Sequence, residues 1–194
     1  MERSAFSGEI CAEKITLDEG ELKRRLGNDY RSTLSKYSDT VKTLFATVKI
    51  KYAASESTLS VDGDTVRVGG VEIRSRALSR HLAGYKKSAV VALTLGIDAD
   101  RFIRRCESQS RTLGFVADAL SSSLIDSACY EIVKKLLGEE KHSAPFAVGY
   151  SDSNIESLPA LLKTADPIRT LGISFTDAYL MLPTKSIIVI VGKM

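Results

Sequence analysis

The chain has 194 residues, of which 44% are hydrophobic and 26% charged, and its formal net charge at pH 7 is +3. These fractions are those of a globular domain and exclude collagen-like, repeat-polymer and intrinsically disordered classes. Apolar runs such as Ile187 to Val191 are far shorter than the roughly 18 residues of a membrane span. Residues 1–10 carry no apolar segment typical of a secretory signal. We therefore expect a soluble, cytoplasmic protein with no membrane partner.

Basic residues are spread along the chain rather than gathered in a patch, and there is no Trp for stacking on bases, so we expect no nucleic-acid partner. The three cysteines, Cys11, Cys106 and Cys129, form no CxxC pair. With only two histidines, His81 and His142, the sequence predicts neither a disulfide framework nor a metal centre. No spacing supports Cys11 and His81 as a catalytic pair.

The first half of the chain predicts short helices followed by a β-hairpin. Thr16 and Glu19 form a capping-box pattern that begins a helix, and Gly27 ends it. Alternating apolar residues around the Asp62-Gly63 turn indicate the hairpin. The predicted elements are helices at 16–25 and 34–46, strands at 59–61, 66–68 and 71–73, a helix at 75–82 and a buried strand at 88–95.

The second half predicts one long helix. Its pattern runs from Thr112 to Leu137 and ends at Gly138, and a shorter helix precedes it from Asp98 to Ser108. The apolar face of the long helix comprises Leu113, Val116, Leu120, Leu124, Ala128, Val133 and Leu137. A loop at 138–154, a helix at 158–163 and strands at 173–175 and 186–191 follow. Because no regular βαβ repeat occurs, we predict a single α+β domain, residues 1–194, with a mostly antiparallel sheet.

The common catalytic signatures GxGxxG, GxxxxGK[ST], GxSxG and HExxH are absent. The glycine pair between Val68 and Val71 is interpreted as a hairpin turn, because a phosphate loop would need a helix to follow it. Arg101, Arg104 and Arg105 recur at helical spacing and form a positive stripe. This stripe is either a solvated helix face or a docking patch for an acidic partner.

The most informative stretch begins at Phe146 and reads FAVGYSDSNIESLPALL, then LGISFTDAYLMLPTKSIIVIVG. A Gly-Tyr step in a loop before a helix, and a later LG-x-S-x-TDA-xx-M-x-P-xx-S segment, resemble the activation domain family of cobalamin-dependent methionine synthase. In this sequence the two features are Gly149-Tyr150 and the segment from Leu171 to Ser186. Upstream, TLGI at 94–97 and DAL at 118–120 resemble standalone members of the family. The resemblance is strongest over residues 70–192.

The resemblance implies an α+β fold with a twisted, mostly antiparallel sheet flanked by helices, one of them long. It implies a standalone protein, not catalytic alone, that binds S-adenosylmethionine and assists reductive methylation of cobalamin. The cobalamin would belong to a partner methionine synthase or corrinoid protein, and a flavodoxin-type donor would supply the electron. The resemblance places S-adenosylmethionine binding at Gly149, Tyr150, Ser151 and Asp152.

The chain departs from the family pattern within this loop. The family has an Arg five residues before the Tyr, suited to a bidentate bond with the ligand carboxylate, and this chain has Pro145. Unless Lys141, Arg169 or Lys185 substitutes, we expect weak binding dominated by the adenosine. No histidine lies in a cobalt-ligating DxHxxG setting and no thiolates cluster to hold zinc, so cobalamin would be met only through the partner.

Two hypotheses stay open on the sequence alone. The first is a reactivation protein that binds S-adenosylmethionine and docks a corrinoid protein. The second is a non-catalytic interaction or regulatory module of the same fold that has lost S-adenosylmethionine binding. The retained Gly-Tyr loop favours the first hypothesis, and Pro145 favours the second.

Overall fold

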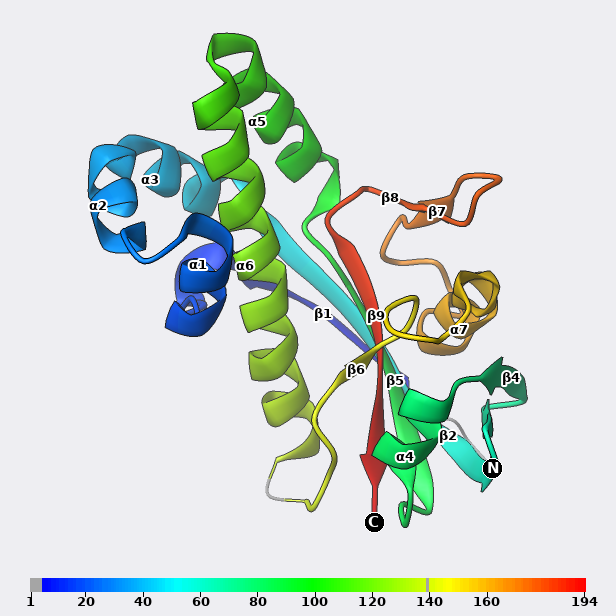
Figure 1. The fold of residues 1–194 in the computed structure, drawn as a ribbon. Helices are drawn as coiled ribbons and strands as arrows, with labels where there is room; N and C mark the ends of the chain where they lie inside the picture. The colour runs from blue at the N-terminus through cyan, green and yellow to red at the C-terminus, as the bar shows by residue number, and fades with distance from the viewer. Residues whose placement is uncertain (1–4, 139) are drawn as a thin grey trace.

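A computed structural model describes residues 5–138 and 140–194 as a curved sheet with helices on both faces (Figure 1). The helices are α1 (Glu19–Leu26), α2 (Tyr30–Lys36), α3 (Ser38–Thr47), α4 (Arg76–Leu82), α5 (Gly96–Gln109), α6 (Arg111–Leu137) and α7 (Leu158–Ala165), with short 3-10 helices η1 (Ala12–Lys14) and η2 (Ile155–Ser157). The strands are β1 (Ala5–Cys11), β2 (Lys49–Asp62), β3 (Thr65–Val68), β4 (Val71–Arg74), β5 (Lys87–Thr94), β6 (Phe146–Ala147), β7 (Ser174–Phe175), β8 (Met181–Leu182) and β9 (Ser186–Lys193).

The main sheet has the order β4-β3-β2-β5-β9-β6, and its neighbouring strands pair antiparallel. The 14-residue strand β2 is long enough to pair with β1 through its first half and with β3 through its last four residues. Strand β9, although late in the chain, lies between β5 and β6. Strands β7 and β8 form a separate small hairpin. This architecture confirms the predicted α+β class with a mostly antiparallel sheet.

Each face of the sheet is covered by its own hydrophobic core. Side chains alternate between the faces along a strand, so Val91 and Val189 join the core beneath α1, α3, α5 and α6. Val90 and Ile188, one position earlier, join the core beneath α4 and α7. Burial on both faces explains why β5 and β9 are continuous apolar runs rather than alternating ones.

Helix α6 crosses the whole helical face and, at 27 residues, is about 40 Å long. It begins at Ser110, whose hydroxyl accepts a hydrogen bond from the Leu113 amide. It ends at Gly138, whose φ of 58° a residue with a side chain would adopt only at a cost. The predicted apolar face is buried at Val116, Leu120, Leu124, Ala128, Val133 and Leu137.

The N-terminal helices differ from their predicted bounds. Asp18, not Thr16, caps α1, because its carboxylate accepts the bond from the Glu21 amide at 2.8 Å. The predicted helix at 34–46 is two helices that meet at Tyr37, whose φ and ψ of −108° and 30° leave the helical region. Ser and Asp at 38–39 favour a new helix start over a helix interior, which accounts for the break.

Four further predicted elements were confirmed and several strands were missed. The two turns at Gly63 and at Gly69-Gly70, the helix at 75–82 and the strand at 88–95 lie where predicted. Helix α5 begins two residues before Asp98. Strands β1, β6, β8 and residues 49–58 of β2 were not predicted. No helix within the described residues is both long and apolar enough to cross a membrane.

Candidate functional site

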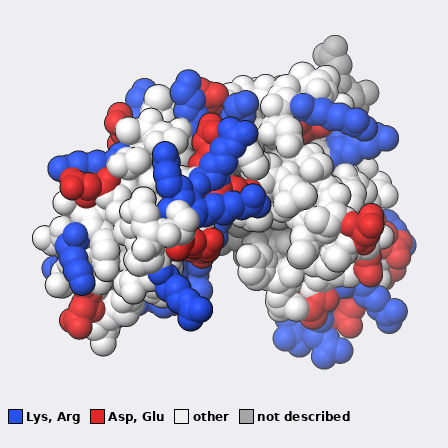
Figure 2. Space-filling view, turned by 90° about the horizontal axis from the view of Figure 1, so that it is seen from above, with Lys and Arg blue, Asp and Glu red and all other residues white. Residues whose placement is uncertain are grey.

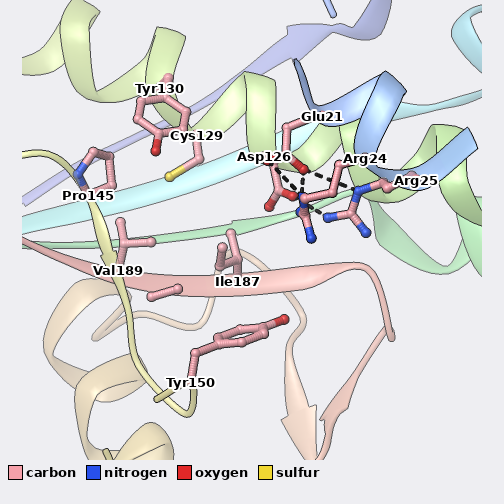
Figure 3. Close-up of a pocket in the computed structure, with 11 residues that line it drawn as sticks. Glu21, Arg24, Arg25, Asp126, Cys129, Tyr130, Pro145, Tyr150, Ile187 and Val189 are labelled. Atoms are coloured by element: carbon pink, nitrogen blue, oxygen red, sulfur yellow. Dashed lines mark hydrogen bonds and ion pairs between the residues drawn. The ribbon is translucent and has the colours of Figure 1, made fainter. Parts of the chain in front are cut away.

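A pocket of about 360 Å³ lies between α1, α6 and the segment that carries β6, with β9 as its floor. Seen from above, the molecule is hollowed between the helical side and the side that carries α7 (Figure 2). The close-up in Figure 3 shows the lining residues, which come from four separate parts of the chain. They are Glu21, Arg24, Arg25, Asp126, Cys129, Tyr130, Pro145, Ala147, Tyr150, Ile187 and Val189.

One wall of the pocket is a network of four charged side chains from α1 and α6. The Arg25 guanidinium donates from Nη2 to Asp126 Oδ2 at 2.5 Å, and its Nε lies 3.4 Å from Glu21 Oε2. Arg24 donates to the same Glu21 carboxylate through both Nε and Nη2. Two guanidinium groups and two carboxylates therefore neutralise one another along this wall.

The electrostatics of this wall follow from its partial burial. Burial raises the pKa of Asp126 above its ordinary value, and the hydrogen bond from Arg25 acts against that shift. The hydrogen bond with Glu21 raises the pKa of Arg24, so Arg24 stays charged at every pH of interest. Asp126 is therefore protonated at a higher pH than an ordinary aspartate.

The opposite side of the pocket is apolar and aromatic. Tyr150 is 70% exposed, and Figure 3 shows its ring across the pocket from the two arginines. Ile187 and Val189 of β9 form the apolar floor between these two sides. A molecule that fills the pocket would therefore meet charged groups at one end and an aromatic face at the other.

The loop that presents Tyr150 is held by its own hydrogen bonds. The Gly149 amide donates to Ser153 Oγ at 3.0 Å, and Ser153 Oγ donates to the Tyr150 carbonyl at 2.8 Å. Gly149 has a φ of +92°, and an added Cβ would lie 3.1 Å from Ile155 Cγ2, so only glycine suits this position. The turn directs Tyr150 outward instead of into the core.

The predicted site residues do not all meet in the pocket. Tyr150 lines it, and Gly149 supports the same loop. Ser151 and Asp152 are not among the lining residues. The Asp152 carboxylate turns the other way, where it accepts hydrogen bonds from Ser75 Oγ at 2.5 Å and from the Arg76 amide at 2.8 Å. Asp152 therefore anchors the loop to the start of α4.

The structure also places the three cations that could have replaced an arginine at position 145. Lys185 is 14% exposed and is bound to Asp118 at 2.7 Å and to Ser122 at 2.8 Å, so it serves the contact with α6. Neither Lys141 nor Arg169 lines the pocket, whereas Pro145 does. The cations that the fold brings to the pocket are Arg24 and Arg25. Sequence reasoning missed these two, because their spacing to Glu21 is that of an ordinary solvated helix.

Within residues 5–138 and 140–194, no three His, Cys, Asp or Glu side chains gather where they could hold a metal ion. Cys106 and Cys129 are buried thiols and Cys11 is exposed. His81 Nε2 lies 2.7 Å from the Ala144 carbonyl, a contact that ties α4 to the segment before β6. The residues that line the pocket offer charged and aromatic contacts to a small molecule.

No protein-family model matches the chain, and no curated protein sequence matches it significantly. Among solved structures, the fold is similar to that of the crystal structure of the MetH reactivation domain bound to AdoHcy. The two chains are 13% identical with a TM-score of 0.67, over 98% of this chain and 78% of the other. At that identity the likeness is one of fold. It confirms the resemblance expected from the Gly-Tyr loop and the Leu171 to Ser186 segment.

Proposed function

We propose that this chain binds S-adenosylmethionine, and its product S-adenosylhomocysteine, in the pocket between α1, α6 and Tyr150. The observation that carries the proposal is the position of Tyr150, which the sequence pattern singled out and which the fold places on a pocket. The fold is shared with a reactivation domain solved with AdoHcy, which supports the same class of ligand. A volume of about 360 Å³ lies within the range of small-molecule sites.

The adenosine end of the ligand suits the aromatic and apolar side of the pocket. The exposed Tyr150 ring offers a flat face for adenine, and Ile187 and Val189 cover the ribose from below. A sulfonium cation near the same ring would gain about 0.5 to 2 kcal/mol, depending on desolvation. The neutral thioether of S-adenosylhomocysteine lacks that gain but keeps every other contact, so we expect its affinity to lie within about 2- to 30-fold of that of S-adenosylmethionine.

The role of the bound ligand is methyl donation to a partner. We propose that the chain docks a corrinoid protein or a methionine synthase module, whose cobalamin has been reduced by a flavodoxin-type donor. The methyl group leaves the sulfonium of S-adenosylmethionine for that cobalamin, and S-adenosylhomocysteine remains in the pocket. The residues of this chain hold and orient the donor, and they contribute no nucleophile.

A second candidate function rests on a specific observation. Pro145 lies in the pocket lining at the position where the family carries an arginine, and the four charges of the α1–α6 wall already satisfy one another. An internally neutral pocket without a loop arginine is also what an interaction module that has lost the ligand would retain. A measurement of S-adenosylmethionine binding distinguishes the two candidate functions.

The deciding experiment is calorimetric titration of the full chain with S-adenosylhomocysteine and with S-adenosylmethionine. We expect saturable binding that Tyr150→Ala weakens more than tenfold. Tyr179→Ala is the matched control, because Tyr179 is a partly exposed tyrosine of the β7–β8 hairpin outside the pocket lining. If neither ligand binds the wild-type chain, the interaction-module function replaces this one.

A further inference from the structure

The amino-acid end of the proposed ligand has no partner on the loop. An S-adenosyl ligand carries a free carboxylate and an ammonium group at the end remote from adenine. Pro145 supplies neither charge nor a backbone donor. The ionised groups that line the pocket come from α1 and α6, and they are Glu21, Arg24, Arg25 and Asp126.

Arg25 and Asp126 are already committed to holding α1 on α6. Their side chains are 25% and 26% exposed and their charged atoms are 2.5 Å apart. Helix α1 packs on α6, and this pair links the two helices. Drawing Arg25 away would leave the half-buried Asp126 carboxylate without its cation, which is costly.

Arg24 differs from Arg25 in both exposure and partners. Its side chain is 62% exposed, and within the described residues its ion-pair partner is Glu21, three positions earlier on the same helix. The Nε and Nη2 fork of Arg24 faces one carboxylate, which is the bidentate geometry that guanidinium prefers. An exposed pair of this kind is worth little by itself, so another carboxylate can take the place of Glu21 at small cost.

We infer that Arg24 is the side chain that binds the carboxylate of the ligand, with Glu21 receiving the ligand ammonium. This inference rests on the proposed function. The ligand carboxylate takes the fork of Arg24, Glu21 turns from Arg24 to the ammonium, and Arg25 stays on Asp126. Every charge keeps an opposite partner before and after binding, so the exchange leaves no ion unpaired.

The geometry of the pocket agrees with such a ligand. Figure 3 shows Glu21, Arg24 and Arg25 on one side, Tyr150 on the other, and Ile187 between them. A ligand with an aromatic base at one end and a free α-amino acid at the other meets both sides at once. The site therefore selects adenosyl compounds that keep the amino-acid end over those that lack it. Arg24 of α1 makes the contact with the ligand carboxylate that Pro145 cannot make.

The test compares two ligands that differ only at this end. S-adenosylhomocysteine keeps the amino acid, whereas 5′-methylthioadenosine has a methyl group in its place. We expect Arg24→Gln to weaken S-adenosylhomocysteine roughly 10- to 150-fold, the loss of one charge-assisted bond, and to change 5′-methylthioadenosine less than twofold. Competition against S-adenosylhomocysteine gives the 5′-methylthioadenosine affinity where direct titration is too weak.

Arg31→Gln is the matched control. Arg31 is an exposed arginine of α2 that pairs with Glu19 at 3.0 Å, outside the pocket lining, and its replacement should leave both ligands unchanged. Equal weakening of both ligands by Arg24→Gln, or weakening of neither, would overturn the inference while the proposed function stands. Failure of the wild-type chain to bind S-adenosylhomocysteine would instead remove the proposed function, and this inference with it.

Discussion

Ser75 Oγ donates a 2.5 Å hydrogen bond to Asp152 Oδ1 across 77 positions of the chain. The same Ser75 hydroxyl accepts a bond from the Leu78 amide and so caps α4. One hydroxyl thus joins the start of a helix to the loop that carries Tyr150. The position of Tyr150 over the pocket depends on α4 through this contact.

The carboxylate of Asp152 should therefore stabilise the fold in a pH-dependent way. Hydrogen bonds from the Ser75 hydroxyl and the Ala77 and Arg76 amides hold the pKa of Asp152 below its ordinary value. A lowered pKa adds stability that is present above the unfolded pKa of about 4 and is lost as the pH falls through the folded pKa. We expect Asp152→Asn to lower the free energy of unfolding at pH 7 and the difference to shrink in acid, measured by urea unfolding at several pH values.

Asp177→Asn is the control for this experiment, because Asp177 is an exposed aspartate on the β7–β8 hairpin. It should change neither the stability nor the response to acid. A difference between Asp152→Asn and wild type that stays constant from pH 7 to pH 3 would show that the charge of Asp152 plays no part in the cap.

Burial of the long helix predicts a large difference between two of its residues. Leu124 is 0% exposed and Phe115, on the same helix, is 59% exposed. We expect Leu124→Ala to cost roughly 2 to 5 kcal/mol in a single unfolding transition of residues 1–194. We expect Phe115→Ala to cost under about 0.5 kcal/mol. Comparable losses from both variants, or two separate transitions, would contradict this packing or the single-domain prediction.

Thiol reactivity should separate the three cysteines. Burial raises the pKa of Cys129 to about 12 and also raises the pKa of Cys106, whereas Cys11 is exposed. Since the thiolate is the reactive form, we expect one fast thiol at pH 8 in the native chain and two more only after unfolding. Reaction with a chromogenic disulfide measures this. The fast phase should disappear in Cys11→Ser, and its survival there would place a reactive thiol inside the fold.

The positive stripe on α5 is either a solvated helix face or a docking patch for an acidic partner. Arg101, Arg104 and Arg105 are exposed, and Figure 2 shows Lys and Arg side chains concentrated on the helical side of the upper face. Within the residues that the structure describes, Arg101 pairs with Asp98 at 3.4 Å and no ion pair joins Arg104 or Arg105, so the stripe keeps most of its positive charge. If it docks an acidic partner, reversal of all three charges should slow association with the corrinoid protein or flavodoxin about tenfold at low salt.

The control reverses the exposed Lys134, Lys135 and Lys141 near the far end of α6. The net charge then changes by the same amount away from the stripe. Equal slowing by both triple variants would indicate a general charge effect and would remove the stripe as a docking surface. Association is measured by stopped-flow at two salt concentrations.

The sequence predicted the elements whose apolar residues recur at helical or strand spacing. It missed the strands that form because another strand pairs with them. The long helix and the Gly63 hairpin were found because apolar spacing and turn residues lie within a few positions of each other. Strand β1 contains Gly8 and Glu9 and shows no strand pattern. It forms because β2 pairs with it, with Gly8 directly opposite Tyr52 and against its ring. That contact spans more than 40 positions, beyond the range of any local pattern.

For the candidate site too, the sequence singles out a residue where the signal is local and misses residues whose position depends on tertiary contacts. A local Gly-Tyr pattern singles out Tyr150, which lines the pocket, and its part in ligand binding stays a prediction. Arg24 and Arg25 were not found, because the bond that brings α1 to the pocket joins Arg25 to Asp126 across 101 positions. The assignment of Asp152 to the ligand stays a prediction, and its side chain binds Ser75 rather than lining the pocket. Neighbours in a loop often diverge, and only tertiary contacts settle their directions.

The place of β9 as an interior strand, between β5 and β6, has a consequence for synthesis on the ribosome. Strand β5 is flanked by β2 on one edge and by β9 on the other, and β9 is separated from β5 by more than 90 residues. Until residues 186–193 have emerged, β5 exposes an unpaired apolar edge, the kind of surface that chaperones bind and that aggregates form on. Ile187 and Val189 line the pocket and belong to β9. A nascent chain that lacks β9 therefore has an incomplete pocket. Any ligand of this pocket could therefore stabilise the finished fold but could not guide its assembly.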